Sequence, residues 1–396
     1  MTGAGRVRRL WLVDHLLRDD VGHHAGYNAA LAEAAERAGV SAVVVGHRDL
    51  SRRGLRSFRT IAHFRTDWRA QPPAWIAGNR RLLGMLEALC ANRFAGDLRN
   101  FPELPESGDF VFAQMIAPRH LQAWTDWLAR QPAPPILALH LGYQPWRFER
   151  PDLRRALDLL PSSVSSNLRF VTDSEKLAGP FRRALGRRVR HLPHVVEAVF
   201  PQAVPGRIGR PPVIFAAGNA RHEKGFADLL HAVALLVPRL ESGGFVVHAQ
   251  CHSPDPFCAE LLGRVVVPAG VSLLAEGLAN DNYVAAIAGA DVIVLPYHLD
   301  HYALRTSGVF CEARCAGRPV IATKGSWAGD RVEREGGGWV VPEKNPEALA
   351  AAIAHAAGPD LAAKASEAAA LQEAARREFS PDGFVQSLLR EERGES

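Results

Sequence analysis

At 396 residues the chain is too long for one ordinary hydrophobic core, and typical domain sizes predict about two domains. Its composition, 47% hydrophobic and 22% charged, is that of a globular protein and excludes a disordered chain. The formal net charge of +5 is modest and comes with no zinc-finger, cold-shock or stacked-aromatic pattern, so we expect no nucleic-acid partner.

Short apolar runs alternate with helix-like stretches along the first half. A helix is predicted over residues 27–38, because apolar side chains recur there at helical spacing and Gly39 follows. Continuous rather than alternating apolar runs suit strands that are covered on both faces, as in a parallel sheet wrapped by helices. The predicted strands are residues 10–13, 42–46, 110–113, 136–139 and 169–172.

The second half repeats this rhythm. A helix over residues 346–357 begins with Asn345 as its cap and Pro346 in its first turn. The predicted strands are residues 213–217, 245–249, 271–275, 291–296, 319–323 and 338–341. The sequence therefore predicts an α/β fold with two Rossmann-like, doubly wound parallel-sheet domains.

A proline- and glycine-rich segment, residues 201–212, is the predicted linker between the two halves. We place the boundary at residue 205, so that residues 1–204 form the first domain and residues 205–380 the second. Residues 381–396 follow the break at Ser380 and Pro381 and are expected to form a tail helix. The sequence does not indicate where this helix packs.

The five cysteines are odd in number and widely scattered, which favours a reducing compartment and a cytoplasmic protein. Neither close cysteine pair has the spacing of a zinc knuckle, so no metal is expected. Arginines cluster at residues 48–59 and 182–190. A solvated surface is the favoured interpretation of both clusters, and peripheral contact with an anionic membrane at its inner face is the alternative.

The first segment that could carry chemistry is residues 213–230, in which a strand ends at Gly218 and a basic loop leads into a helix. Ligands of open α/β sheets bind at the carboxyl ends of the strands, where free amides at a helix start attract anions. Arg221 and Lys224 would add full positive charges there. An exposed basic turn that only caps a helix fits this loop equally well.

The second segment is residues 291–323, where Ser307 and Gly308 open a helix that carries Glu312. Gly308 and Glu312 are four positions apart, so the helix start and the carboxylate lie on one face. Amides at a helix start suit phosphate, and a carboxylate suits the paired hydroxyls of a ribose. Taken alone, Glu312 would be read as a surface glutamate.

The chain resembles the retaining glycosyltransferases of family 4, which share the two-domain GT-B fold. The similar stretches are GNARHEKGFADLLHAVALL, LLAEGLANDNYVAAIAGADVIVLPY, EARCAGRPVIAT and GGGWVVPEKNPEALAAAIAHA in the second half, and FVTDSEKLAGPFRRALGRRVRHLPHVV in the first. They occur in the family's order and cover most of the chain. The resemblance implies two domains facing a cleft, with a nucleotide sugar bound mainly by the second and an acceptor mainly by the first.

The resemblance also implies roles for single residues. Lys224 would contact the donor diphosphate, and Glu312 would hold the ribose. His140, in ILALHLGYQP, matches a catalytic histidine that follows a first-domain strand, and a hydrogen-bonded histidine at a strand end is the structural alternative. The other implied donor contacts are the early glycine loop at Gly22, the phosphate loop at Gly218 and Asn219, and the helix start at Ser307, Gly308 and Val309.

Two departures from the family pattern concern charge. The family commonly has arginine directly after the phosphate-loop glycine, where this chain has Asn219, and Arg221 could supply that charge from two residues further on. The family also pairs two glutamates, and Leu304 stands in the place of the first. The resemblance therefore supports contacts to the nucleotide more strongly than contacts to the sugar.

The resemblance thus implies a metal-independent glycosyltransferase that takes its sugar from a nucleotide-sugar donor and retains the anomeric configuration. Its acceptor, whether glycan, lipid carrier or small molecule, is not indicated. The alternative is a catalytically degenerate GT-B protein that acts as a nucleotide-binding or scaffolding module. A nucleotide-sugar epimerase is a third interpretation, although its usual carboxylates are not evident.

Overall fold

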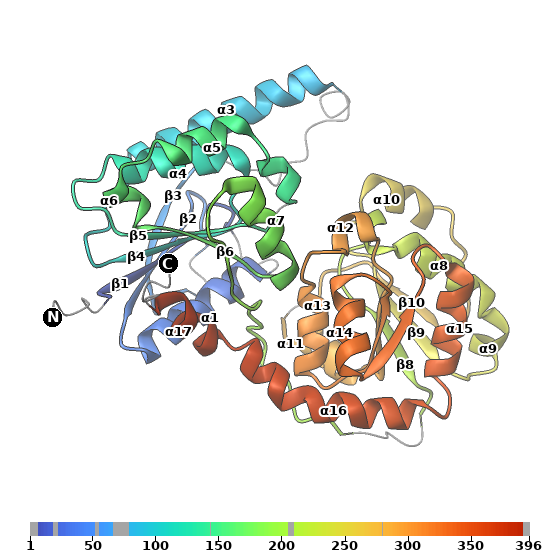
Figure 1. The fold of residues 1–396 in the computed structure, drawn as a ribbon. Coiled ribbons are helices and arrows are strands. Elements are labelled where there is room, and N and C mark those ends of the chain that lie inside the picture. Colours follow the sequence, from blue (N-terminus) through green and yellow to red (C-terminus); the bar gives the residue numbers. More distant parts are fainter. Residues whose placement is uncertain are drawn as a thin grey trace. The chain divides into compact units, whose positions relative to one another are not determined.

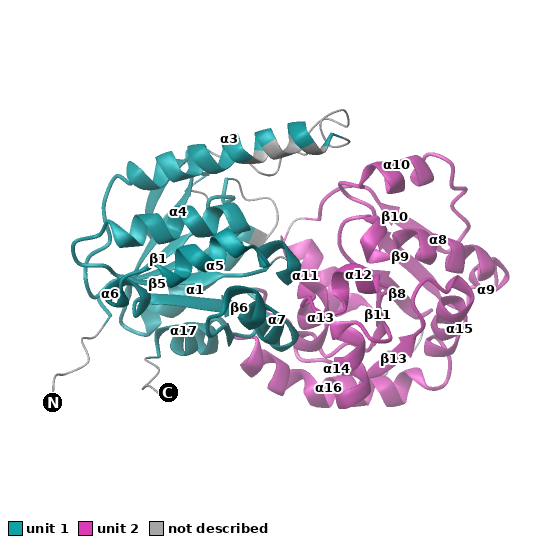
Figure 2. Ribbon diagram, turned by 45° about the horizontal axis from the view of Figure 1, so that its top comes forward, with its two compact units in different colours: residues 1–197, 381–396 teal, residues 198–380 magenta. Residues whose placement is uncertain are grey.

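The computed structural model describes residues 7–18, 23–51, 55–65, 79–142, 144–204, 210–278 and 280–390. The chain divides into two compact units, residues 1–197 with 381–396, and residues 198–380 (Figure 2). The predicted boundary at residue 205 lies outside the described residues. The observed division falls earlier because helix α16, Leu361–Glu378, holds the preceding segment. Gln372 accepts a hydrogen bond from the Ala203 amide, and Arg376 donates to the Phe200 carbonyl.

The first unit contains a sheet that, over its described residues, has seven strands in the order β3-β2-β1-β4-β5-β6-β7. Every strand pairs in parallel with its neighbours. The strands are β1 Arg9–Val13, β2 Ser41–His47, β3 Arg59–Phe64, β4 Phe110–Ala113, β5 Ile136–His140, β6 Leu168–Thr172 and β7 Arg190–His191. The helices are α1 His23–Arg37, α3 Arg80–Arg99, α4 Pro118–Ala129, α5 Pro151–Asp158, α6 Ser162–Ser165, α7 Glu175–Leu185 and α17 Pro381–Leu389.

Helices cover both faces of this sheet, as the continuous apolar runs predict (Figure 1). Along β1, Trp11 and Val13 enter one core with side chains of α3, α4, α5 and α7. Leu10 and Leu12 enter the opposite core with side chains of α1 and α17. Alternate residues of one strand therefore serve two helix layers, which defines a doubly wound sheet.

The tail helix α17 packs in the first unit against α1. Phe384, Val385 and Leu388 are buried in the core that also contains Leu31 of α1. Arg37 closes this contact at the surface through its hydrogen bond to Asp382, at 2.9 Å. The last helix of the chain thus completes a unit whose other elements end before residue 198.

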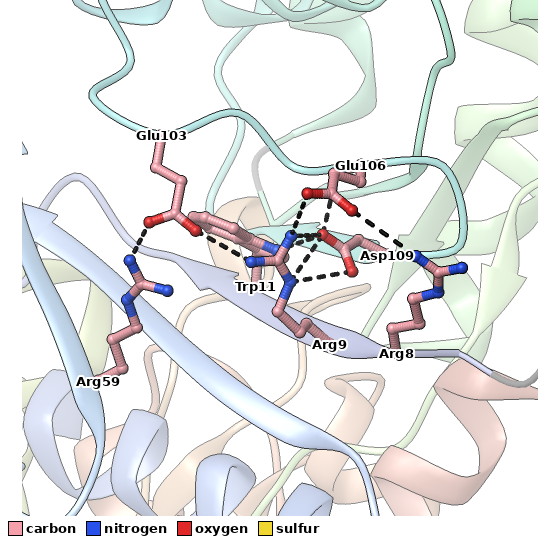
Figure 3. Close-up of polar contacts among 7 residues, drawn as sticks. All are labelled: Arg8, Arg9, Trp11, Arg59, Glu103, Glu106 and Asp109. Carbon is pink, nitrogen blue, oxygen red and sulfur yellow. Dashed lines mark hydrogen bonds and ion pairs between the residues drawn. The ribbon is translucent and has the colours of Figure 1, made fainter.

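A network of charged side chains joins the amino ends of β1 and β3 to the segment that precedes β4 (Figure 3). Its centre is Asp109, whose side chain is fully buried and accepts hydrogen bonds from the Trp11 indole at 3.0 Å and the Glu106 amide at 2.9 Å. Arg9 pairs with Asp109 at 2.7 Å and with Glu103 at 2.9 Å, and Glu103 also pairs with Arg59. This network lies at the amino ends of the strands, opposite to the edge where their carboxyl ends lie.

The second unit has a sheet of six strands among its described residues, in the order β10-β9-β8-β11-β12-β13, and these strands are also parallel. They are β8 Val213–Ala216, β9 Val246–Gln250, β10 Val271–Leu274, β11 Val292–Leu295, β12 Val320–Thr323 and β13 Gly338–Val341. The helices are α8 Phe226–Leu235, α9 Val237–Glu241, α10 Pro256–Leu262, α11 Asn280–Gly289, α12 Leu299–Tyr302, α13 Gly308–Cys315, α14 Trp327–Glu335, α15 Pro346–Ala356 and α16 Leu361–Glu378.

The predicted strands are present in both units, with ends that differ by a residue or two. Helix α15 begins as predicted, because the Asn345 side chain accepts a hydrogen bond from the Ala348 amide at 2.8 Å. Strands β3 and β7 were not predicted. Both lie at sheet edges, where β3 is partly exposed and β7 has only two residues, so neither forms a continuous buried run.

Candidate functional site

The loop after β8 is shaped by Gly218, which has a φ of 100° in the left-handed region. Its amide donates a hydrogen bond to the side chain of Gln250, at the end of β9, over 2.6 Å. A Cβ atom at this position would lie 2.7 Å from Lys224 Nζ and 3.9 Å from Val309 Cγ2. The glycine therefore allows the Lys224 ammonium and the start of α13 to approach the same stretch of backbone.

Lys224 ends a 3-10 turn, His222–Lys224, that precedes α8. Gly225 follows with a φ of 66°, and a Cβ on it would lie only 1.9 Å from the carbonyl oxygen of Pro296. Burial, together with the charge of Arg221, lowers the pKa of Lys224 to about 8, although the charges of Glu223 and Glu312 act in the opposite direction. The ammonium is thus mainly charged at neutral pH but lies close to its titration range.

Helix α13 begins at Gly308, and the buried Ser307 caps it by accepting a hydrogen bond from the Phe310 amide at 3.2 Å. Glu312 lies one turn further on and is only 8% exposed. The Tyr283 hydroxyl of α11 donates to its carboxylate at 2.5 Å. Glu312 is therefore a buried, oriented carboxylate and not the surface glutamate of the structural alternative.

The structure brings several predicted residues of the second unit together. Gly218, Lys224 and Val309 are in direct proximity, and the charge of Glu312 acts on Lys224. Asn219 is half-buried in the same loop. Arg221 is exposed and lies 3.7 Å from Glu223. The loop and the helix start are thus combined into one site at the carboxyl ends of β8 and β11.

Four further residues line or support this site and were not predicted from the sequence: Gln250, Tyr283, Tyr302 and Arg305. Gln250 is the last residue of β9, so the carboxyl-end rule could have found it. Arg305 lies above the Tyr302 ring, with 5.5 Å from its guanidinium carbon to the ring centroid. Tyr283 and Tyr302 reach the site only through tertiary packing, which sequence spacing does not show.

In the first unit, His140 is the last residue of β5 and is half-buried. Burial lowers its pKa, the charge of Asp173 opposes this, and His194 adds to the lowering. His140 is therefore held mainly as a neutral imidazole at the carboxyl edge of the sheet. Gly22, the predicted early glycine, lies outside the described residues.

A buried polar chain lies at the same edge of the first unit and was not predicted. Asp14 follows β1, is fully buried, and accepts hydrogen bonds from the Asn28 amide at 3.0 Å and the Leu16 backbone amide at 3.1 Å. His24 Nδ1 lies 2.7 Å from the same carboxylate. Burial opposes ionisation of Asp14, but the hydrogen bond and charge of His24 outweigh it and lower the Asp14 pKa. Gln114 completes the chain by donating to Asn28 at 2.7 Å.

Across the described residues, no group of three or more His, Cys, Asp or Glu side chains is arranged to hold a metal ion. In the same part of the chain, no helix is both long and apolar enough to cross a membrane. The positive charge and the amides of the second-unit site suit an anionic ligand.

Residues 211–358 match the family described as Glycosyl transferases group 1. This segment runs from β8 past α15 and contains every candidate residue of the second-unit site. No curated protein matches the chain by sequence.

Solved structures resemble the fold of nearly the whole chain. Sucrose-phosphate synthase from Thermosynechococcus elongatus has a TM-score of 0.65 at 16% identity, covering 96% of this chain and 97% of that one. Alr3699/HepE of Anabaena, solved with UDP and glucose, has a TM-score of 0.65 at 18% identity, covering 96% and 98%. A UDP-forming α,α-trehalose-phosphate synthase from Burkholderia xenovorans has a TM-score of 0.66 at 13% identity, covering 96% and 98%.

The chain has the GT-B fold, formed by its two parallel-sheet units. Its second unit carries the group 1 domain, and the candidate phosphate loop and ribose carboxylate lie within that domain.

Proposed function

We propose that the chain transfers a sugar from a nucleotide-sugar donor to an acceptor, with retention of the anomeric configuration. The observation that carries this proposal is the convergence of Lys224, Gly218 and the start of α13. Fixed positive charge and free amides at one point suit a diphosphate, and the buried Glu312 one turn along α13 suits a ribose. The sequence match of residues 211–358 supports the same assignment.

In this proposal the donor binds to the second unit through three kinds of contact. Lys224 neutralises the diphosphate, and the amides of Ser307, Gly308 and Val309 donate to its oxygens. Glu312, oriented by Tyr283, accepts hydrogen bonds from the ribose hydroxyls. Gly218 and Asn219 shape the loop beneath the diphosphate. The HepE structure contains UDP, which makes uridine nucleotides the first donors to test.

The reaction breaks the bond between the anomeric carbon and the terminal phosphate oxygen, and the bonding electrons stay on that oxygen. The acceptor oxygen forms the new bond on the same face and gives its proton to an oxygen of the leaving diphosphate. Charge increases on the diphosphate during this step, so oriented amides and Lys224 would stabilise the transition state more than the ground state. His140 is the proposed first-unit residue that contacts the reacting groups.

Because this charge comes from side chains and amides, we propose that transfer needs no divalent cation. Activity that persists in excess EDTA is the expected result, and loss that Mg²⁺ or Mn²⁺ restores would contradict it.

The alternative function, a nucleotide-binding or scaffolding module without turnover, is motivated by Asn219 and Leu304. Leu304 is 37% exposed, so an apolar side chain stands at the surface where the family has a carboxylate. The buried Glu312 and the half-buried cation of Lys224 favour a working donor site over this alternative. The two differ in one observable, because the module would bind nucleotide and release no diphosphate from a nucleotide sugar with any acceptor.

The test is thermal stabilisation by UDP, GDP, ADP and TDP and their common sugar conjugates. A ligand at 100 times its dissociation constant adds about 2.7 kcal/mol to the stability of the state that binds it. We expect one nucleotide to stabilise the protein, with the effect lost in Lys224→Ala and Glu312→Ala. If none of the nucleotides shifts the unfolding temperature, the proposed donor site is wrong.

We also propose peripheral contact with anionic lipid through exposed arginines of the first unit. Arg182 and Arg183 are exposed, whereas Arg187 pairs with Asp158 and Arg59 pairs with Glu103, so only part of each cluster is available. Co-sedimentation with phosphatidylserine vesicles at low salt is the expected result. Binding no greater than to neutral vesicles would contradict it.

A further inference from the structure

Three cationic side chains surround the second-unit site, and they differ in their carboxylate partners. Arg221 lies 3.7 Å from Glu223 and is therefore partly neutralised. Within the described part of the chain, neither Lys224 nor Arg305 makes an ion pair with a carboxylate. Both are half-buried, so their charges are less screened by water than that of the exposed Arg221. Among the described residues, the site therefore holds two cations that form no ion pair with a carboxylate.

Arg305 is positioned by aromatic rings. Its guanidinium carbon lies 5.5 Å from the centroid of Tyr302, and the Tyr302 ring lies 4.3 Å from that of Tyr297. Both tyrosines are buried, and Tyr297 is hydrogen-bonded to the helix cap Ser307. A guanidinium that stacks on a ring keeps its N–H groups available at its edge, and those N–H groups match the geometry of phosphate oxygens.

The same packing brings Arg305 to the Lys224 side of the site. The Pro296 carbonyl, next to Tyr297, is in such close contact with Gly225 that no side chain fits there. Lys224 directly precedes this glycine, and Ser307 begins the helix whose Val309 side chain lies beside Gly218. Consistent with this arrangement, the charge of Arg305 contributes to lowering the pKa of Lys224.

We propose that Arg305 is the second cation of the diphosphate site and binds the donor together with Lys224. This inference rests on the proposed function. A nucleotide sugar carries one negative charge on each of its two phosphates, which the charges of Lys224 and Arg305 would balance. Arg221, the candidate that the sequence offers for the position of Asn219, already faces Glu223 and contributes less.

The assignment gives Arg305 a role in the reaction as well as in binding. When the bond to the anomeric carbon breaks, its electron pair remains on the terminal phosphate oxygen and the diphosphate gains a negative charge. A guanidinium that donates two hydrogen bonds to this phosphate stabilises that additional charge. Arg305 thus touches the leaving group, whereas Tyr302 and Tyr297 are positioning residues.

The test compares Arg305→Gln with the matched control Arg221→Gln by calorimetric titration. The ligands are the nucleoside diphosphate that stabilises the wild-type protein and the monophosphate of the same base. We expect Arg305→Gln to weaken diphosphate binding about 10- to 100-fold, as is typical for a lost charged hydrogen bond. Because only diphosphate binding weakens, the ratio of the monophosphate to the diphosphate dissociation constant should fall. A merely structural defect would weaken both ligands equally and leave this ratio unchanged.

Arg305→Lys retains the charge without the planar fork and should give an intermediate ratio. An unchanged ratio in Arg305→Gln, or a larger fall in Arg221→Gln, would overturn the inference and leave the proposed function standing. A wild-type protein that binds none of the four nucleoside diphosphates would overturn both.

Discussion

Lys224 shows how local packing sets the chemistry of one side chain. The positive φ of Gly218 leaves room for its ammonium, and the turn at Gly225 fixes where its backbone lies. Burial is the main reason why its pKa falls to about 8. A lysine in this state responds to pH within a range in which ordinary lysines stay fully charged.

Donor binding should therefore weaken as the pH rises through about 8, because the free protein loses the Lys224 proton in that range. Below this pH the ammonium is present and binding is constant; above it, binding must take up a proton. Titration of the stabilising nucleotide between pH 6.5 and 9.5, in buffers of different ionisation enthalpy, would show the proton uptake. Lys224→Arg should bind with little pH dependence, and an identical slope in both proteins would assign the titration to another group.

The element scale is illustrated by the Asp109 network. Asp109 lies just before β4 and fixes the segment of Glu103 and Glu106 against the amino end of β1. The Asp109 side chain is fully buried, whereas the Glu106 side chain is 65% exposed, so Asp109 is the buried acceptor of the network. Ion pairs of the same type thus contribute differently to stability, depending on whether they are buried or exposed to solvent.

We expect Asp109→Ala to lower the free energy of unfolding by about 3 kcal/mol, since it leaves Arg9 and the Trp11 indole without their buried acceptor. Glu106→Ala removes only exposed ion pairs of 3.7 Å and should cost less than about 0.5 kcal/mol. Urea denaturation of both variants measures the difference. Equal losses would show that burial of Asp109 does not determine the strength of the network.

At the scale of the whole molecule, the chain enters the second unit at Ala198 and leaves it at Ser380. The first unit therefore needs the end of the chain, because α17 fills part of the core on one face of its sheet. Burying a large apolar side chain contributes about 1.5–3 kcal/mol, and α17 buries Phe384, Val385 and Leu388.

Removal of residues 381–396 should therefore destabilise the first unit by several kcal/mol, while the second unit keeps its response to nucleotide. Hydrogen exchange should increase in α1 and β1 and stay unchanged in β8 and α13. Asp382→Ala, which removes one exposed ion pair with Arg37, is the control and should behave as wild type. Unaltered exchange in α1 would mean that α17 is dispensable.

Much of the fold was predictable from the sequence. Strand β4 matches its predicted range because it is buried on both faces and appears as a continuous apolar run. The order of the strands along the chain, with helices between them, was sufficient for two parallel sheets. The edge strand β3 could not be found in this way, since its residues are only partly buried.

The sequence by itself determined the class of fold, the glycine loop of the candidate site and the helix start with Glu312, because each depends on neighbours within a few residues. Only the tertiary structure decided which charges meet. Asn28 and Gln114 reach Asp14, Tyr283 reaches Glu312, and Tyr302 orients Arg305 through contacts that sequence spacing does not show. The placement of α17 was likewise decided there, since an apolar helix face can cover any complementary core and only the packed structure selects one.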